Sequence, residues 1–142
     1  IINFDIEDSF IALEYKAGDN TRKKKKTNNS AQTEYENVPD EDRYCFLVAR
    51  NSEMLKIIGS EMHNCVGWGY AEAVRDRRTT IVYALYKNKY KICIEVTPQF
   101  TIRQAFGPSN SALEGDSLDA YREWCEEKRI RFEKAFSVHC AP

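Results

Sequence analysis

The segment Met62-His63-Asn64-Cys65-Val66-Gly67 contains the residues whose types and spacing are best suited to chemistry. Cys65 comes just before a helix that the sequence predicts over residues 66–76. Unpaired backbone N–H groups and the dipole at a helix start favour a thiolate, so Cys65 is a candidate nucleophile. The alternative is that Cys65 is a small buried residue between two helices, which is how free cysteine usually behaves.

His63 is the candidate base for this cysteine, because the second histidine, His139, lies near the end of the chain. On a continuous helix, side chains two positions apart point about 200° away from each other. A direct pair with Cys65 therefore requires a helix break between Met62 and Val66. The alternative is that His63 ends the preceding helix and binds its last carbonyl groups.

Residues that follow could complete a pocket at this helix start. Gly67 and Gly69 lack side chains and would let a ligand approach the backbone. Trp68 and Tyr70 could form its walls. The sequence thus predicts a ligand-binding role for Gly67, Trp68 and Tyr70, although the glycines could equally serve tight packing.

Gln104 is the most informative polar residue in the second half of the chain. Alternation along the predicted strand 100–106 places it on the same face as Ile102 and Phe106, with Arg103 on the other. An amide on an apolar face needs partners, because leaving it unpaired costs about 1–3 kcal/mol. Gln104 is therefore either a structural bridge to a loop or aimed at a ligand.

The turn Gly107-Pro108-Ser109-Asn110 follows this strand. Asn110 is either a turn asparagine that bonds its own backbone or a site residue, since loops at strand ends commonly carry function. Gly107 joins the candidate ligand-binding residues. Glu95, on the preceding strand, is expected to be a solvated or ion-paired carboxylate and not an acid catalyst.

Metal and cofactor sites are not expected. His63 and Cys65 could supply two ligands, but a structural zinc site needs four and a catalytic one three. Cys45, Cys93 and the pair His139-Cys140 lack a matching short spacing. The chain also has no phosphate-binding glycine loop, Ser-His-Asp order or paired-carboxylate pattern.

Positive charge is concentrated in one run, Arg22-Lys23-Lys24-Lys25-Lys26. The remaining 16 basic and 22 acidic residues give a net charge of −6. A dedicated nucleic-acid-binding domain normally spreads its positive charge over a face. The run therefore supports a secondary hypothesis, in which these five residues contact the phosphates of a nucleic acid or nucleoprotein complex.

The five cysteines are scattered along the chain without the close pairing of a disulfide framework. A reducing, cytoplasmic setting is the simpler interpretation. No apolar run approaches the roughly 18 residues that would span a bilayer, so no membrane partner is expected.

The elements that must position these residues can be predicted from periodicity. Residues 4–16 are expected to be extended with a turn or bulge at residues 7–9, and residues 18–42 to form a long polar surface loop. After a cap at Asn51, a helix places Leu55, Ile58 and Met62 on one face and ends near His63. A final helix is predicted over about 116–136, with Leu118, Tyr121, Cys125, Phe132 and Ala135 on one stripe.

Three strands, predicted at 79–86, 90–96 and 100–106, are joined by short connectors, which indicates an antiparallel meander. The first is apolar on both faces, so it is expected to be central and covered on both sides. The chain length fits a single domain over residues 1–142. The predicted fold class is α+β: an antiparallel sheet, with the meander at about 79–106 plus amino-terminal strands, packed against two or three helices.

The order of these motifs resembles the PcfJ-like proteins. The resemblance rests on Met62 to Gly67, the nearby Tyr70, Ile94-Glu95-Val96, Ile102 to Gly107, and Asn110, and covers about residues 44 to 130. It departs from the family pattern at Asn64, where a second histidine is expected, and at Trp68-Gly69. The resemblance implies a bacterial or phage cytoplasmic protein encoded on conjugative plasmids, phages or other mobile elements.

The resemblance also implies that four polar residues, His63, Cys65, Gln104 and Asn110, are shared site positions. If the domain is an enzyme, Cys65 would be the nucleophile, His63 its base, and Gln104 or Asn110 the orienting amide for a small-molecule or protein substrate. The two alternatives are the nucleic-acid-binding accessory described above and a scaffold in which the polar cluster is purely structural.

Overall fold

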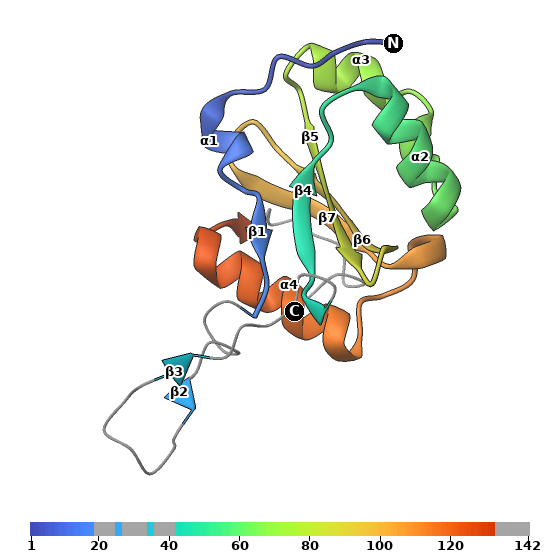
Figure 1. Ribbon diagram of the computed structural model, residues 1–142. Helices are drawn as coiled ribbons and strands as arrows, with labels where there is room; N and C mark the ends of the chain where they lie inside the picture. The colour runs from blue at the N-terminus through green and yellow to red at the C-terminus, as the bar shows by residue number, and fades with distance from the viewer. Residues whose placement is uncertain (19–24, 27–33, 36–41, 133–142) are drawn as a thin grey trace.

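A mixed six-stranded sheet forms the centre of the protein (Figure 1). The computed structural model describes residues 1–18, 25–26, 34–35 and 42–132. In spatial order the strands are β1 (Tyr15–Lys16), β4 (Cys45–Val48), β5 (Thr80–Tyr86), β6 (Lys89–Val96), β7 (Thr101–Phe106) and β8 (Arg131–Phe132). Neighbours are antiparallel except β7 and β8, which are parallel. The short strands β2 (Lys25–Lys26) and β3 (Glu34–Tyr35) pair separately.

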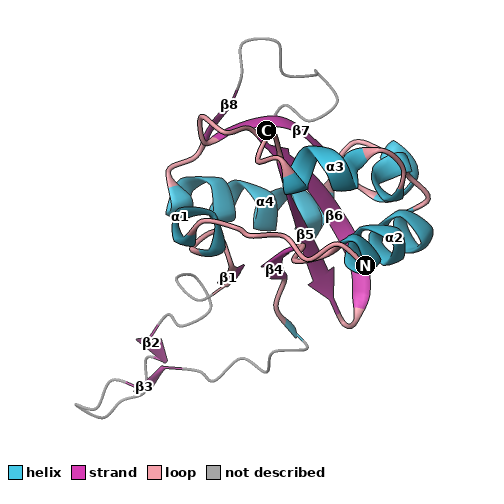
Figure 2. Cartoon of the chain, turned by 90° about the horizontal axis from the view of Figure 1, so that it is seen from above, coloured by secondary structure: helices cyan, strands magenta, loops and turns pink. Residues whose placement is uncertain are grey.

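Helices cover both faces of this sheet (Figure 2). On one face lie α1 (Asp8–Ile11) and α4 (Gly115–Lys128), and on the other α2 (Ser52–Met62) and α3 (Tyr70–Arg75). Two 3-10 turns, η2 (Cys65–Gly67) and η3 (Pro108–Asn110), follow α2 and β7. Within the described part of the chain, no helix has the length and apolar character needed to cross a membrane.

The predicted α+β fold and the antiparallel meander are confirmed by this architecture. Strand β5 lies inside the sheet between β4 and β6, and its residues 80–84 are all buried. Ile81 packs with the α2 and α3 residues, while Val82 packs with those of α4. Because successive side chains alternate between the faces, a strand that is apolar at every position must be covered on both sides.

Helix α2 begins and ends where the sequence predicts. The Asn51 side chain caps it by accepting a hydrogen bond from the Met54 backbone N–H at 2.8 Å. Leu55, Ile58 and Met62 are fully buried on its sheet-facing side. The helix stops because His63 adopts a left-handed conformation (φ 53°), and its backbone N–H bonds the Gly59 carbonyl.

Two predicted segments at the ends of the chain are wrong. Residues 4–16 are expected to be extended on both sides of a turn at residues 7–9, but the turn is the helix α1 at residues 8–11 and only Tyr15 and Lys16 join the six-stranded sheet. The last helix does not reach residue 136, because Arg129 is left-handed (φ 53°) and ends α4 at Lys128. Phe132 therefore lies in β8 and not on the helical stripe.

Several predictions fall wholly or partly outside the described residues. Most of the predicted loop 18–42 lies there, including Arg22, Lys23 and Lys24, and so do Ala135, His139 and Cys140. Lys25 and Lys26 are the two residues of β2.

Candidate functional site

A small pocket lies where η2 and α3 face strands β6 and β7. Four residues that the sequence predicts as site residues line it, namely Cys65, Tyr70, Gln104 and Asn110. Its volume is about 40 Å³. One water molecule needs roughly 10–15 Å³ of such space, whereas pockets for whole ligands measure about 300–1,000 Å³. The pocket can therefore accept a single functional group of about three non-hydrogen atoms.

Four other predicted site residues do not line the pocket. His63 is exposed at the end of α2, and Trp68 is 82% exposed. Gly67 lies against the α2 backbone, where an added Cβ would be 3.2 Å from the Lys56 Cα. Gly107 is buried, and an added Cβ there would be 2.8 Å from the Ser111 hydroxyl oxygen.

The helical conformation is interrupted between α2 and η2, which is the condition that a direct pair of Cys65 and His63 requires. After the left-handed His63, Asn64 is extended and its Oδ1 accepts a hydrogen bond from the Val66 N–H at 3.0 Å. The predicted helix 66–76 ends where the sequence indicates but starts too early, because the chain first forms the three-residue turn η2 and only after Gly69 (φ 76°) the separate helix α3. Cys65 thus has no long helix dipole behind it, and this argument for a thiolate is lost.

Two glycines hold η2 against α2. A Cβ added to Gly59 of α2 would lie 3.0 Å from the Gly67 nitrogen and 3.2 Å from the Asn64 carbonyl oxygen. Both contacts are to backbone atoms, which cannot move aside as a flexible side chain could. The close approach of the two segments therefore fixes the position of Cys65, which is exposed beside the pocket.

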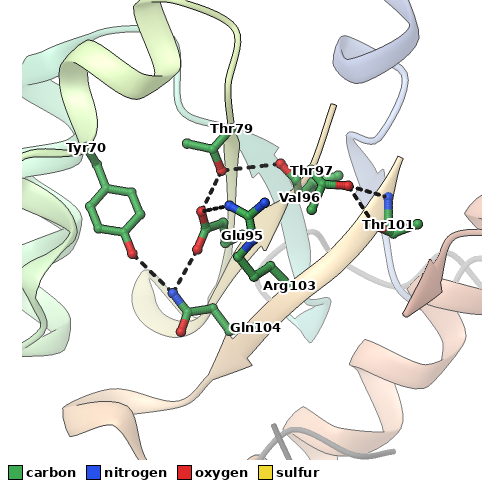
Figure 3. A network of polar contacts seen from close by, with 8 residues as sticks. All are labelled: Tyr70, Thr79, Glu95, Val96, Thr97, Thr101, Arg103 and Gln104. Atoms are coloured by element: carbon green, nitrogen blue, oxygen red, sulfur yellow. Dashed lines mark hydrogen bonds and ion pairs between the residues drawn. The ribbon is translucent and has the colours of Figure 1, made fainter. Parts of the chain in front are cut away.

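A buried carboxylate organises the floor of the pocket (Figure 3). Glu95 of β6 is only 6% exposed. Its Oε2 accepts hydrogen bonds from the Thr79 hydroxyl at 2.8 Å and from the Arg103 guanidinium at 3.0 Å. Its Oε1 accepts one from Gln104 Nε2 at 2.9 Å. These bonds compensate for the loss of water around the charge.

A bulge in β7 brings Arg103 and Gln104 to this carboxylate. Gln104 pairs with Glu95 and Ile102 pairs with Val96, so Arg103 is an extra residue in the ladder. Ile102 consequently packs against the α4 side of the sheet, while Gln104 contacts α3 on the other side. The prediction that Gln104 shares a face with Ile102 and opposes Arg103 is therefore wrong, because a bulge interrupts the two-residue period.

The orientation of the Gln104 amide follows from its partners. Since an ionised carboxylate only accepts hydrogen bonds, the amide nitrogen must face Glu95. The same nitrogen donates to the Tyr70 hydroxyl oxygen at 3.2 Å. Burial raises the pKa of Tyr70, and the negative charge of Glu95 raises it further, so the phenol keeps its proton at neutral pH.

A family model described as PcfJ-like protein matches residues 8–120. The chain belongs to the PcfJ-like protein family. This match begins earlier than the 44–130 that the motifs suggested, so it includes α1 and the basic run, and it ends within α4. No curated protein and no solved structure matches the chain.

Cys93 and Glu95 line the pocket of this PcfJ-like chain but were not among the predicted site residues. For Glu95, the expected ion pair is confirmed, but the carboxylate is buried and not solvated. The sequence feature that could have indicated this role is the single charged residue within the apolar run Ile92 to Val96. A buried strand tolerates such a charge only if hydrogen-bonding or ion-pairing partners compensate for it. Those partners come from residues 79, 103 and 104, and their convergence depends on the bulge.

The other thiols in the described part of the PcfJ-like domain are less accessible than Cys65. Burial raises the pKa of Cys93 to about 12, against the opposing effect of the Asn64 side chain, which hydrogen-bonds the sulfur. Burial likewise raises the pKa of Cys125 to about 12. Both thiols stay protonated at neutral pH. Among the described residues, no three His, Cys, Asp or Glu side chains are grouped so that they could hold a metal ion.

Proposed function

We propose that this PcfJ-like domain binds one polar group of a larger ligand in the pocket between η2, α3 and the sheet. The observation that supports the proposal is the buried Glu95 carboxylate, which holds Gln104 and, through it, Tyr70 at a pocket that is open to solvent. Orienting side chains before the ligand arrives lowers the entropy loss on binding.

A purely structural role for the same network is the main alternative. Burying a charge is unfavourable even when the charge is paired, and an apolar cluster of similar shape often stabilises a fold as well or better. The presence of this polar network at the floor of a pocket is therefore better explained by a role in ligand binding than by a role in stabilising the fold. The size of the pocket limits the bound part of the ligand to one small group.

The catalytic form of this proposal uses Cys65 as nucleophile, His63 as base, and Gln104 or Asn110 as the orienting amide. The exposed thiol at the pocket supports the first role. His63 does not line the pocket, and both N–H groups of the Gln104 amide are already bonded. The geometry therefore supports ligand binding better than a Cys-His mechanism.

NMR titration with small polar probes tests the binding proposal. We expect at least one of formamide, urea, acetate and methylguanidinium to shift the side-chain amide signals of Gln104 and Asn110. Gln104→Leu should remove the effect, because it keeps the size of the side chain and loses the amide. The matched control is Gln99→Leu, at an exposed glutamine in the β6–β7 turn. Absence of any shift at 100 mM probe would refute the proposal.

Nucleic-acid binding through the basic run at residues 22–26 is the second hypothesis. The run lies within the family match, which supports a role in the shared domain. Carboxylates of Asp42, Asp116, Asp119, Glu123 and Glu126 gather near Gly18, where the described chain stops before the run. They would oppose the approach of a phosphate backbone.

Salt dependence of DNA and RNA binding tests this hypothesis. If all five basic residues contact phosphates, log K should fall with log salt with a slope of about −4. Serine at positions 22–26 should abolish that slope, whereas the control Lys87→Ser with Lys89→Ser, at two exposed residues of the β5–β6 turn and the start of β6, should keep it. Fluorescence anisotropy with single- and double-stranded oligonucleotides at 20–200 mM salt measures it. No binding at the lowest salt eliminates the hypothesis.

We further propose that residues 1–142 form a single domain that acts in the cytoplasm of a bacterium carrying a mobile element. The four cysteines within the described residues, Cys45, Cys65, Cys93 and Cys125, are free thiols. Free thiols are typical of a reducing compartment, which supports this setting.

A further inference from the structure

We propose that the group bound in this pocket is a primary carboxamide. The inference rests on the binding function proposed above and adds the chemical class of the ligand. Three features of the pocket support it: the hydrogen-bonding atoms that the protein leaves available, the charge beside them, and the volume.

The available hydrogen-bonding atoms of Gln104 and Tyr70 form a complementary pair. Both hydrogens of Gln104 Nε2 are used, one by Glu95 and one by the Tyr70 oxygen. The amide oxygen of Gln104 points away from Glu95 and has no partner among the described residues (Figure 3). The Tyr70 oxygen accepts from Gln104, so its own O–H remains available to donate.

A ligand group that satisfies both atoms needs a donor for the Gln104 oxygen and an acceptor for the Tyr70 hydroxyl. A primary carboxamide carries an N–H and a C=O on one carbon, so it offers both at adjacent positions. A carboxylate has no hydrogen to donate, and an ammonium group has no lone pair to accept. Leaving either protein atom unpaired in a filled pocket would weaken binding.

Charge at the pocket disfavours an anionic group. Glu95 is buried and bonds the same Gln104 nitrogen that bonds the Tyr70 hydroxyl, so its negative charge lies close to the phenol, and it raises the pKa of Tyr70 beyond the effect of burial. A carboxylate bound at the same place would meet the same repulsion. Arg103 pairs with Glu95 Oε2, but it is not among the residues that line the pocket.

The volume of the pocket agrees with this group. About 40 Å³ accommodates roughly three non-hydrogen atoms, and a carboxamide has three: carbon, oxygen and nitrogen. The remainder of the ligand would pass the exposed Cys65 at the pocket edge. The carboxamide could belong to a small molecule or to an asparagine or glutamine side chain, because the pocket receives only the shared end group.

Alkylation of Cys65 by two reagents of the same shape tests the inference. Iodoacetamide carries a carboxamide and iodoacetate a carboxylate; with each, the thiolate sulfur displaces iodide from the CH₂ group and the thiol proton passes to the buffer. Peptide mass spectrometry gives both rates at Cys65. The reference is the ratio of these rates at the same cysteine in the urea-unfolded chain.

We expect the iodoacetamide-to-iodoacetate ratio at Cys65 of the folded protein to exceed that reference at least tenfold, with saturation by iodoacetamide. Tyr70→Phe should lower the ratio toward the reference by removing the donor hydroxyl, leaving only the part that comes from repulsion by Glu95, whereas Tyr90→Phe, on the same sheet face but outside the pocket, should preserve it. Because Glu95 is present in both variants, a change between them cannot arise from its repulsion of iodoacetate.

The outcomes separate this inference from the proposed function. Saturation by both reagents with an unchanged ratio overturns the carboxamide assignment and leaves the binding pocket intact. Two results together would overturn both the carboxamide assignment and the binding function. These are alkylation that does not saturate and has the ratio of the unfolded chain, and the absence of any probe shift in the NMR titration. Protection of Cys65 by propionamide but not propionate supports a small-molecule source, and stronger protection by a Gly-Gln-Gly peptide than by Gly-Glu-Gly supports a side-chain source.

Discussion

Replacing Glu95 by alanine is expected to lower the free energy of unfolding by about 3 kcal/mol. Removal of one partner from a buried charged network leaves the others without compensation, which typically costs about 3–5 kcal/mol. The lower end applies here, because the Arg103 side chain is 45% exposed and can regain water. One N–H of Gln104 would lose its partner inside the fold, whereas the Thr79 hydroxyl could still donate to the Val96 carbonyl oxygen at 3.3 Å. Urea unfolding followed by circular dichroism measures the change.

The matched control is Glu61→Ala, at an exposed position of α2, which should alter stability by less than about 0.5 kcal/mol. Glu95→Gln adds a second test, because it keeps the shape and removes the charge. It should also free the Gln104 amide to rotate, so the side-chain signals of Gln104 should broaden. Equal stability of the alanine variant and the wild type would contradict the central place given to this carboxylate.

Replacing Gly59 by valine is expected to destabilise the protein by about 2–3 kcal/mol and to change the alkylation rate of Cys65. The new side chain would meet the Gly67 nitrogen and the Asn64 oxygen, both backbone atoms, and overpacking of this kind costs about 1–3 kcal/mol. Valine gains little over glycine in helix propensity, so no compensation is expected. The turn η2 must then shift away from α2.

Ser60→Val is the control for this substitution, since residue 60 is the next helical position and is exposed. It introduces the same side chain without a contact to η2, so Cys65 should react at the wild-type rate. Urea unfolding and timed alkylation with iodoacetamide give the two readouts. A Gly59→Val protein with unchanged reactivity at Cys65 would show that η2 does not depend on this contact.

Periodicity in the sequence was sufficient to predict the middle of the fold. Helix α2 has a capping residue at Asn51, an apolar face and an end at His63, and these local signals agree with its packing. The meander β5 to β7 was predictable because its connectors are too short for parallel crossovers. The end of α4 was not, because Arg129 adopts the left-handed conformation without the glycine that usually marks it.

The candidate site was predictable only in part, for a related reason. Cys65, Tyr70, Gln104 and Asn110 were selected by residue type and order, and the pocket brings these four together. Glu95 gains its place only through contacts with residues 8 to 16 positions away along the chain. Alternation cannot reveal such contacts when one extra residue shifts the strand.

The extra residue at position 103 has a consequence for how PcfJ-like sequences should be aligned. A gap-free alignment of this strand against a relative with regular pairing would match Gln104 to a residue that faces the opposite layer. The gap belongs opposite Arg103, between the residues equivalent to Ile102 and Gln104. With the gap in that place, the alignment shows whether a relative has both the carboxylate and the amide. A relative without the extra residue would need its amide directly after the residue equivalent to Ile102, and without that amide it would lack the floor of the pocket.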